Sequence, residues 1–215
     1  MKPTALDHVA LHVSDPESVT RALCARLPFR VLERTDEFVL VGRSPALGKL
    51  TLFRADGPRE RGSLVRVGIG IPCGTTRATI DLDDELAVEL VPADPDGDVD
   101  LDHVAFLVPD PEESERRWLR FGLEPEPPVG GVRRVRVGRS LIELHAGSPE
   151  ATDRPVLDHL GLLVDSIEET RRSAAERGLE VTREVEAESS YALFVGGPDG
   201  VEVEYIEHKP SFALA

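Results

Sequence analysis

Apolar side chains along the chain fall mainly into short runs typical of buried strands, and three of these runs are nearly identical. The runs read LDHVALHV, LDHVAFLV and LDHLGLLV, and they begin at Leu6, Leu101 and Leu157. Each is an almost unbroken apolar stretch with a histidine at its third position, a pattern typical of a strand that is buried on both faces. Such self-similarity predicts a fold built from copies of one unit.

A helix and further strands are expected after each copy. Each helix is predicted from a capping residue followed by acidic residues, with proline in the first turn in two cases. The helix starts are Ser14–Glu17, Asp110–Glu113 and Ser166–Glu169, and the helices end near Pro28, Gly122 and Gly178. Strand-like runs complete the units at 38–41 and 50–53, at 132–137 and 141–144, and at 191–195 and 201–206. The repeated unit is therefore of βαβββ type.

A fourth, degraded copy fits between the first two. Residues 64–71 match the apolar pattern but carry Arg66 in place of histidine, and no clear helix follows. The segment 92–98, rich in proline, glycine and acid, is the best linker in the chain. We therefore expect an α+β fold of tandem βαβββ modules, with an N-terminal domain over residues 1–97, partly degraded, and a C-terminal domain over residues 98–215.

Composition narrows the choice of compartment and partner. The chain has 215 residues, 40% of them hydrophobic, which suffices for two small domains. Its net charge of −15 argues against nucleic acid or anionic lipid as a partner. The sequence shows neither a secretion leader nor an apolar stretch of about 18 residues. Cys24 and Cys73 form no metal-binding or disulfide pattern, so we expect a cytoplasmic protein.

Several motifs together resemble the vicinal-oxygen-chelate superfamily. They are the LDHV strand, the Asp-Pro-Glu helix start, and Pro198-Asp199-Gly200 leading into Val203-Glu204. This superfamily includes glyoxalase I, methylmalonyl-CoA epimerase, extradiol dioxygenases and the bleomycin- and fosfomycin-resistance proteins. The resemblance spans almost the whole chain and implies that modules pair into curved sheets around a cavity. The sequence permits pairing within the chain or across a homodimer.

The resemblance also implies metal ligands on the first and last strands of each module. His103 and His159 stand at the first-strand positions of the C-terminal half, and Glu143 and Glu204 stand at the last-strand positions. A lone histidine in a buried strand favours a hydrogen-bonded core residue, but two with matching acids favour a divalent Fe, Mn, Ni, Co or Zn ion over a metal-free cavity. Glu143 and Glu204 are the predicted catalytic bases.

The N-terminal half lacks a complete set of ligands. His8 and Glu89 match a histidine and an acid position, but Leu52 and Arg66 occupy the other two. A cation at Arg66 would repel a metal ion and would pair with Glu89 instead. We therefore expect this half to be a structural partner. The remaining histidines, His12, His145 and His208, are expected at the surface or behind the ligands.

The number of ligands decides between the reactions that the resemblance implies. In this superfamily the metal binds two adjacent oxygens of a small substrate. Four protein ligands favour a glyoxalase- or epimerase-like lyase or isomerase, which is the leading prediction. If Glu143 does not bind, a set of two histidines and one carboxylate favours an extradiol-type Fe(II) dioxygenase, although no acid-base histidine precedes Tyr191. The third alternative, a metal-free, ligand-sequestering resistance-type protein, is disfavoured by the small number of aromatic residues.

Overall fold

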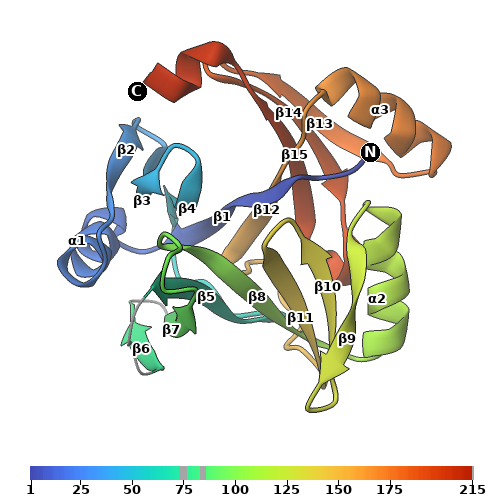
Figure 1. Ribbon diagram of the computed structural model, residues 1–215, viewed down its shortest axis with the longest axis horizontal. Coiled ribbons are helices and arrows are strands. Elements are labelled where there is room, and N and C mark those ends of the chain that lie inside the picture. Colours follow the sequence, from blue (N-terminus) through green and yellow to red (C-terminus); the bar gives the residue numbers. More distant parts are fainter. Residues whose placement is uncertain (73–76, 83–85, 215) are drawn as a thin grey trace.

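The computed structural model describes residues 1–72, 77–82 and 86–214, which form two mixed β-sheets with helices packed on them (Figure 1). The first module comprises β1 (Ala5–Val13), α1 (Pro16–Arg26), β2 (Arg30–Arg34), β3 (Phe38–Ser44) and β4 (Leu47–Arg54). The second comprises β5 (Leu64–Pro72), β6 (Ala78–Asp81) and β7 (Ala87–Ala93). The third comprises β8 (Asp100–Val108), α2 (Pro111–Arg120), β9 (Glu124–Val129), β10 (Val132–Val137) and β11 (Ser140–Ala146). The fourth comprises β12 (Leu157–Leu163), α3 (Ile167–Glu176), β13 (Val181–Glu186), β14 (Ser190–Gly196) and β15 (Glu202–His208), with 3-10 turns η1 (Pro198–Gly200) and η2 (Pro210–Leu214).

The predicted α+β fold of tandem βαβββ modules is confirmed. Its helices begin where the capping signals place them, because the Asp15 and Asp110 side chains accept backbone N–H groups of the first turn and proline follows each. Within its described residues, the second module has three strands where the others have four strands and a helix. The expectation of one shortened module is therefore met.

The modules pair within the chain, the first with the fourth and the second with the third. The eight-stranded sheet has the order β13-β14-β15-β12-β1-β4-β3-β2, and the seven-stranded sheet has the order β6-β7-β5-β8-β11-β10-β9. In each sheet the two first strands of the paired modules lie antiparallel at the centre, β1 beside β12 and β5 beside β8. The division predicted at residue 97 therefore does not separate the sheets, since each sheet takes one module from either side of it.

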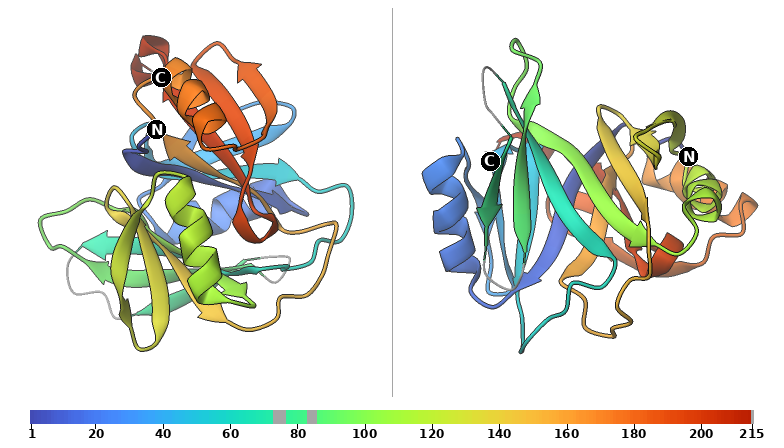
Figure 2. Two further views of the ribbon diagram at one scale, coloured as in Figure 1. Left: turned by 90° about the vertical axis from the view of Figure 1, so that its right-hand side faces the viewer. Right: turned by 90° about the horizontal axis from the view of Figure 1, so that it is seen from below.

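The helices cover one face of the sheets and leave the other face free for a site. Helix α1 packs on β3 and β4, α3 packs on β14 and β15, and α2 packs on the strands of the third module (Figure 2). On this covered side the Tyr205 hydroxyl donates to the Phe121 carbonyl at 2.9 Å, which ties β15 to the end of α2. The opposite face of the eight-stranded sheet curves around a cavity.

The cysteines and the absence of a membrane-spanning segment can be compared with the sequence-based expectations only in the described residues. Among the described residues, Cys24 on α1 is a free thiol, and Cys73 lies outside them. No helix in the described segments has the length and apolar character needed to span a bilayer.

Candidate metal centre

Three buried side chains from the central strands of the eight-stranded sheet converge on one point. The Nε2 atom of His8 lies 3.0 Å from the Nε2 atom of His159 and 3.0 Å from Oε2 of Glu204. The Nε2 atom of His159 lies 3.3 Å from the same carboxylate oxygen. The three residues, on β1, β12 and β15, could hold a metal ion together.

Strand register produces this convergence. In the antiparallel pair β1–β12, His8 lies opposite Gly161, and in the parallel pair β12–β15, Glu204 lies beside the same glycine. A Cβ atom at Gly161 would lie 2.3 Å from the His8 ring, so only glycine leaves space for the imidazole. His8 from the first module therefore reaches the ligands of the fourth module.

The aspartate that precedes each histidine fixes its ring. Asp7 Oδ2 lies 2.9 Å from Nδ1 of His8, and Asp158 Oδ1 lies 2.5 Å from Nδ1 of His159. Because a carboxylate only accepts, each Nδ1 carries the proton and each Nε2 turns toward Glu204. The repeated Asp-His dipeptide thus orients both imidazoles as metal-binding histidines are oriented in proteins.

The second oxygen of each aspartate is held by residues from other strands. Asp7 Oδ1 accepts from the buried Lys49 ammonium at 2.7 Å and lies 2.8 Å from Nε2 of His208. Asp158 Oδ2 lies 2.7 Å from Nε2 of His12. His12 and His208 therefore contact the aspartates that orient the candidate ligands.

Electrostatics of the cluster follow from burial and close opposite charges. Burial favours neutral His8, but the Asp7 and Glu204 carboxylates outweigh it and raise the pKa of His8 to about 9. Burial likewise opposes the charge on Glu204, but His159 and His8 outweigh it and lower the pKa of Glu204 to about 2. The pKa of His159 is also raised, since Asp158 and Glu204 outweigh its burial. The metal-free site therefore holds a carboxylate and a proton where a cation would bind.

The geometry suits a divalent ion with these three ligands. Ligand atoms about 2.1 Å from an ion, in mutually adjacent octahedral positions, lie about 3.0 Å apart, close to the three distances in the cluster. Oε2 of Glu204 is buried and accepts no hydrogen bond of favourable geometry from the described residues, so a bound cation would satisfy it. His8, His159 and Glu204 thus match the facial set of two histidines and one carboxylate.

The comparisons with known proteins agree with this architecture. No protein-family model matches the chain, and no curated protein matches it in sequence. A solved structure from Bacillus subtilis described as a "putative dioxygenase" superposes with a TM-score of 0.80 over 99% of this chain and 87% of that chain, at 16% identity. Glyoxalase I from Zea mays superposes with a TM-score of 0.74 over 94% of this chain and 92% of that chain, at 14% identity. The chain has the vicinal-oxygen-chelate fold. At these identities the likeness shows the fold alone.

Because the modules of this fold are copies of one unit, the residues at equivalent places on their last strands can be compared directly. Thr51 on β4 pairs in register with Ala10, two residues after His8, just as Glu204 pairs with Gly161, two residues after His159. The fourth position of the centre is therefore Thr51. The comparison of the modules by sequence alone had placed Leu52 there, which is wrong by one residue. Thr51 lines the cavity and provides a neutral hydroxyl at the position where a set of two histidines and two carboxylates would have its second carboxylate.

The predicted four-residue centre is divided between the two sheets. His103 on β8 and Glu143 on β11 lie in the seven-stranded sheet, where both contact the Arg66 guanidinium. Sequence reasoning assigned ligands to the C-terminal half as a unit and so set His8 aside. The signal that identifies it, the antiparallel pairing of β1 with β12, is a long-range contact that the module repeat does not reveal.

A cavity of about 490 Å³ surrounds the candidate centre. Its lining includes His8, His159, Glu204 and Thr51 together with Lys49 and His208. Four of the seven phenylalanines also line it, namely Phe38, Phe53, Phe194 and Phe212. The sequence contains few aromatic residues, but more than half of its phenylalanines lie in the wall of this cavity, so the cavity is rich in aromatic rings.

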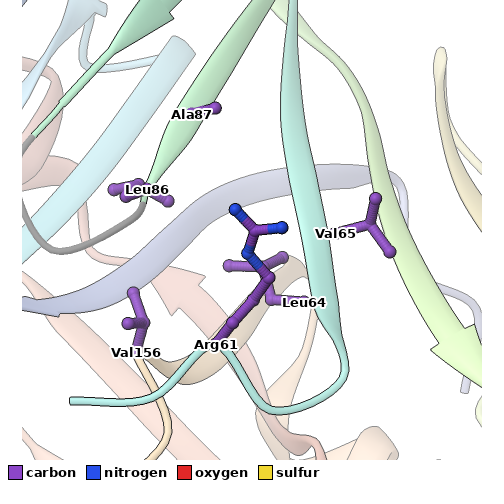
Figure 3. A pocket seen from close by; sticks show the side chains of 6 residues that line it. All are labelled: Arg61, Leu64, Val65, Leu86, Ala87 and Val156. Atoms are coloured by element: carbon purple, nitrogen blue, oxygen red, sulfur yellow. The ribbon is translucent and has the colours of Figure 1, made fainter. Parts of the chain in front are cut away.

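A second hollow lies between β5, β7 and the segment before β12 (Figure 3). It measures only about 10 Å³ and is lined by Arg61, Leu64, Val65, Leu86, Ala87 and Val156. None of these six side chains is a histidine or an acid, and the space admits about one water molecule. This hollow offers no ligand set for a metal ion.

Proposed function

We propose that the chain is a divalent-metal-dependent enzyme that binds a small aromatic substrate through two adjacent oxygens and cleaves its ring with dioxygen, as an extradiol-type dioxygenase. The metal would be held by His8, His159 and Glu204. This replaces the leading sequence-based prediction with its first alternative. The observation that carries the proposal is the set of three ligands with Thr51 at the fourth position.

Ligand count favours ring cleavage over the lyase or isomerase reaction. An octahedral ion with three protein ligands keeps three open positions, which accommodate two substrate oxygens and dioxygen. Four ligands would leave room only for the two substrate oxygens. A threonine hydroxyl also cannot serve as a base at neutral pH, and Glu143, one of the two predicted bases, contacts Arg66 in the other sheet.

The aromatic walls support an aromatic substrate. Phe194 and Phe53 have their ring centroids 5.3 and 6.3 Å from that of His159, so rings flank the candidate metal ligands. Phe38 packs edge-on against Phe53 at 5.8 Å and extends the same wall. Rings at these separations contact a planar ligand favourably and exclude water from its reacting carbons.

Residues of this chain also provide for proton movement. When bound, the metal ion would supply Lewis-acid chemistry to the substrate oxygens and, as Fe(II), electrons to dioxygen. His208 on β15 lines the cavity, its Nε2 is anchored on Asp7, and its Nδ1 is buried without a hydrogen-bond partner. We assign His208 as the group that takes up a substrate hydroxyl proton, because the stretch before Tyr191 has no histidine for this role.

Oxygen uptake tests the proposal directly. The protein is stripped of metal, loaded with Fe(II) under nitrogen, and mixed with air-saturated catechol and with 3- and 4-substituted catechols. We expect one dioxygen consumed per ring opened, loss of activity in His8→Ala, and activity retained in the matched variant His103→Ala.

Two results would contradict the proposed reaction. Bound Fe(II) without oxygen uptake on any catechol, together with oxygen-independent isomerisation of a 2-oxoaldehyde hemithioacetal, would favour the glyoxalase-like reaction with Glu204 as base. Ligand binding by protein that takes up no metal would favour the sequestering function.

A further inference from the structure

The seven-stranded sheet contains the same four positions as the candidate metal centre. Its last-strand acids, Glu89 and Glu143, pair in register with Gly68 and Ala105, two residues after the first-strand residues of their modules. Those first-strand residues are Arg66 on β5 and His103 on β8. A Cβ atom at Gly68 would lie 2.3 Å from the His103 ring, as one at Gly161 would from His8. Three of the four positions thus carry metal-type ligands.

The histidine in this second cluster is prepared like those of the first. Nδ1 of His103 lies 2.7 Å from Oδ1 of the preceding Asp102, so its Nε2 turns toward the cluster. His103 is buried and Nε2 lies 3.6 Å from Oε2 of Glu89. Nothing in the orientation of this ring distinguishes it from the imidazoles of the eight-stranded sheet.

The Arg66 guanidinium contacts the histidine and both last-strand acids of this cluster through two of its nitrogens. Its Nε lies 2.9 Å from Oε2 of Glu89 and 3.1 Å from Nε2 of His103, and Nη2 lies 2.8 Å from Oε2 of Glu143. All three potential ligand atoms therefore lie within 3.1 Å of one guanidinium nitrogen or another. Arg77 pairs with the other oxygen of Glu89 at 2.8 Å, which balances the second carboxylate charge.

We propose that this cluster is a metal site closed by its own side chain, in which the Arg66 guanidinium takes the place of a divalent transition-metal ion. It joins β5, β7, β8 and β11, and so holds the second and third modules together without a metal. The chain therefore binds one divalent ion and not two. Removal of the guanidinium leaves an imidazole and two carboxylates, a set that accepts Co(II) or Zn(II).

Metal counting on Arg66→His tests this proposal with Co(II) as the probe. The variant is made in the wild-type chain and in a His8→Ala, His159→Ala background, so the outcome is separate from that of the proposed function. We expect one more equivalent of Co(II) than in the parent in both backgrounds, with visible absorption bands of nitrogen and oxygen coordination. Addition of His103→Ala should remove that extra equivalent.

Stability measurements keep the test decisive if Arg66→His folds poorly. In Arg66→Ala the two carboxylates lose the cation that they share, and only Glu89 keeps a partner in Arg77. The melting temperature should therefore fall below that of wild type and rise again with Co(II), whereas Arg66→Ala, His103→Ala should gain no such rescue. A folded Arg66→His that binds no additional Co(II), an unrescued Arg66→Ala, or two equivalents in wild type would each overturn the proposal.

Discussion

The aspartates behind the candidate ligands provide a matched pair of variants. Asp158 accepts from Nδ1 of His159, and Asp102 accepts from Nδ1 of His103 in the equivalent place of the other sheet. Asp158→Asn keeps the shape of the side chain but removes the negative charge that holds the imidazole proton on Nδ1 and makes the Nε2 lone pair a stronger metal ligand. Asp102→Asn makes the same change where no metal is expected.

Loss of such a carboxylate costs about 10- to 100-fold in metal affinity, or about 1.4 to 2.7 kcal/mol. Asp158 is partly exposed and hydrogen-bonded also to His12, so we expect no loss of folding in the variant. Competition with a chromophoric chelator measures the affinity for Zn(II) or Co(II) of wild type and both variants. We expect a weakening of this size in Asp158→Asn and unchanged affinity in Asp102→Asn. Equal effects of the two substitutions, or no effect of Asp158→Asn, would refute the reasoning.

Three other perturbations have definite expected outcomes. Lys49→Met leaves the buried Asp7 carboxylate without its ammonium, so urea unfolding should show a loss of about 3 to 5 kcal/mol, and a loss below about 1 kcal/mol would mean that the pair is not buried in solution. Because the pKa of His8 is raised from 6.5 to about 9, its contribution to the metal-free protein is complete below pH 6.5 and is lost as the pH rises through about 9. Chelator-treated protein should therefore lose about 3 kcal/mol over this range, and His8→Gln should lack that slope. Gly161→Ala displaces the His8 ring and should reduce bound metal more than 10-fold, whereas Gly68→Ala, its counterpart in the other sheet, should leave bound metal unchanged.

Local patterns in the sequence predicted the modules well because their signals are local. Asp15 and Asp110, each followed by proline, cap helices in the structure as they do in the pattern. The repeated Leu-Asp-His phrase marks three first strands, because a strand buried on both faces must be apolar apart from residues that find polar partners. The pairing of Arg66 with Glu89 was also predictable, since both positions follow from the repeat.

The candidate site was only half predictable, because it depends on which modules pair. His159 and Glu204 belong to one module, and their positions in the repeat are sufficient to select both. His8 comes from a module about 150 residues earlier, and only the antiparallel pairing of β1 with β12 brings it to them. The phenylalanines of the cavity are likewise spread over separate strands and gather only in the folded chain.

Metal content of two single variants tests the central claim most directly. His8 and His103 stand at equivalent positions of the repeat, and both are buried histidines backed by an aspartate. After loading with Co(II) or Fe(II) and removal of excess metal, we expect one equivalent in wild type and in His103→Ala, and less than about a tenth of an equivalent in His8→Ala. Metal retained by His8→Ala and lost by His103→Ala would contradict the account.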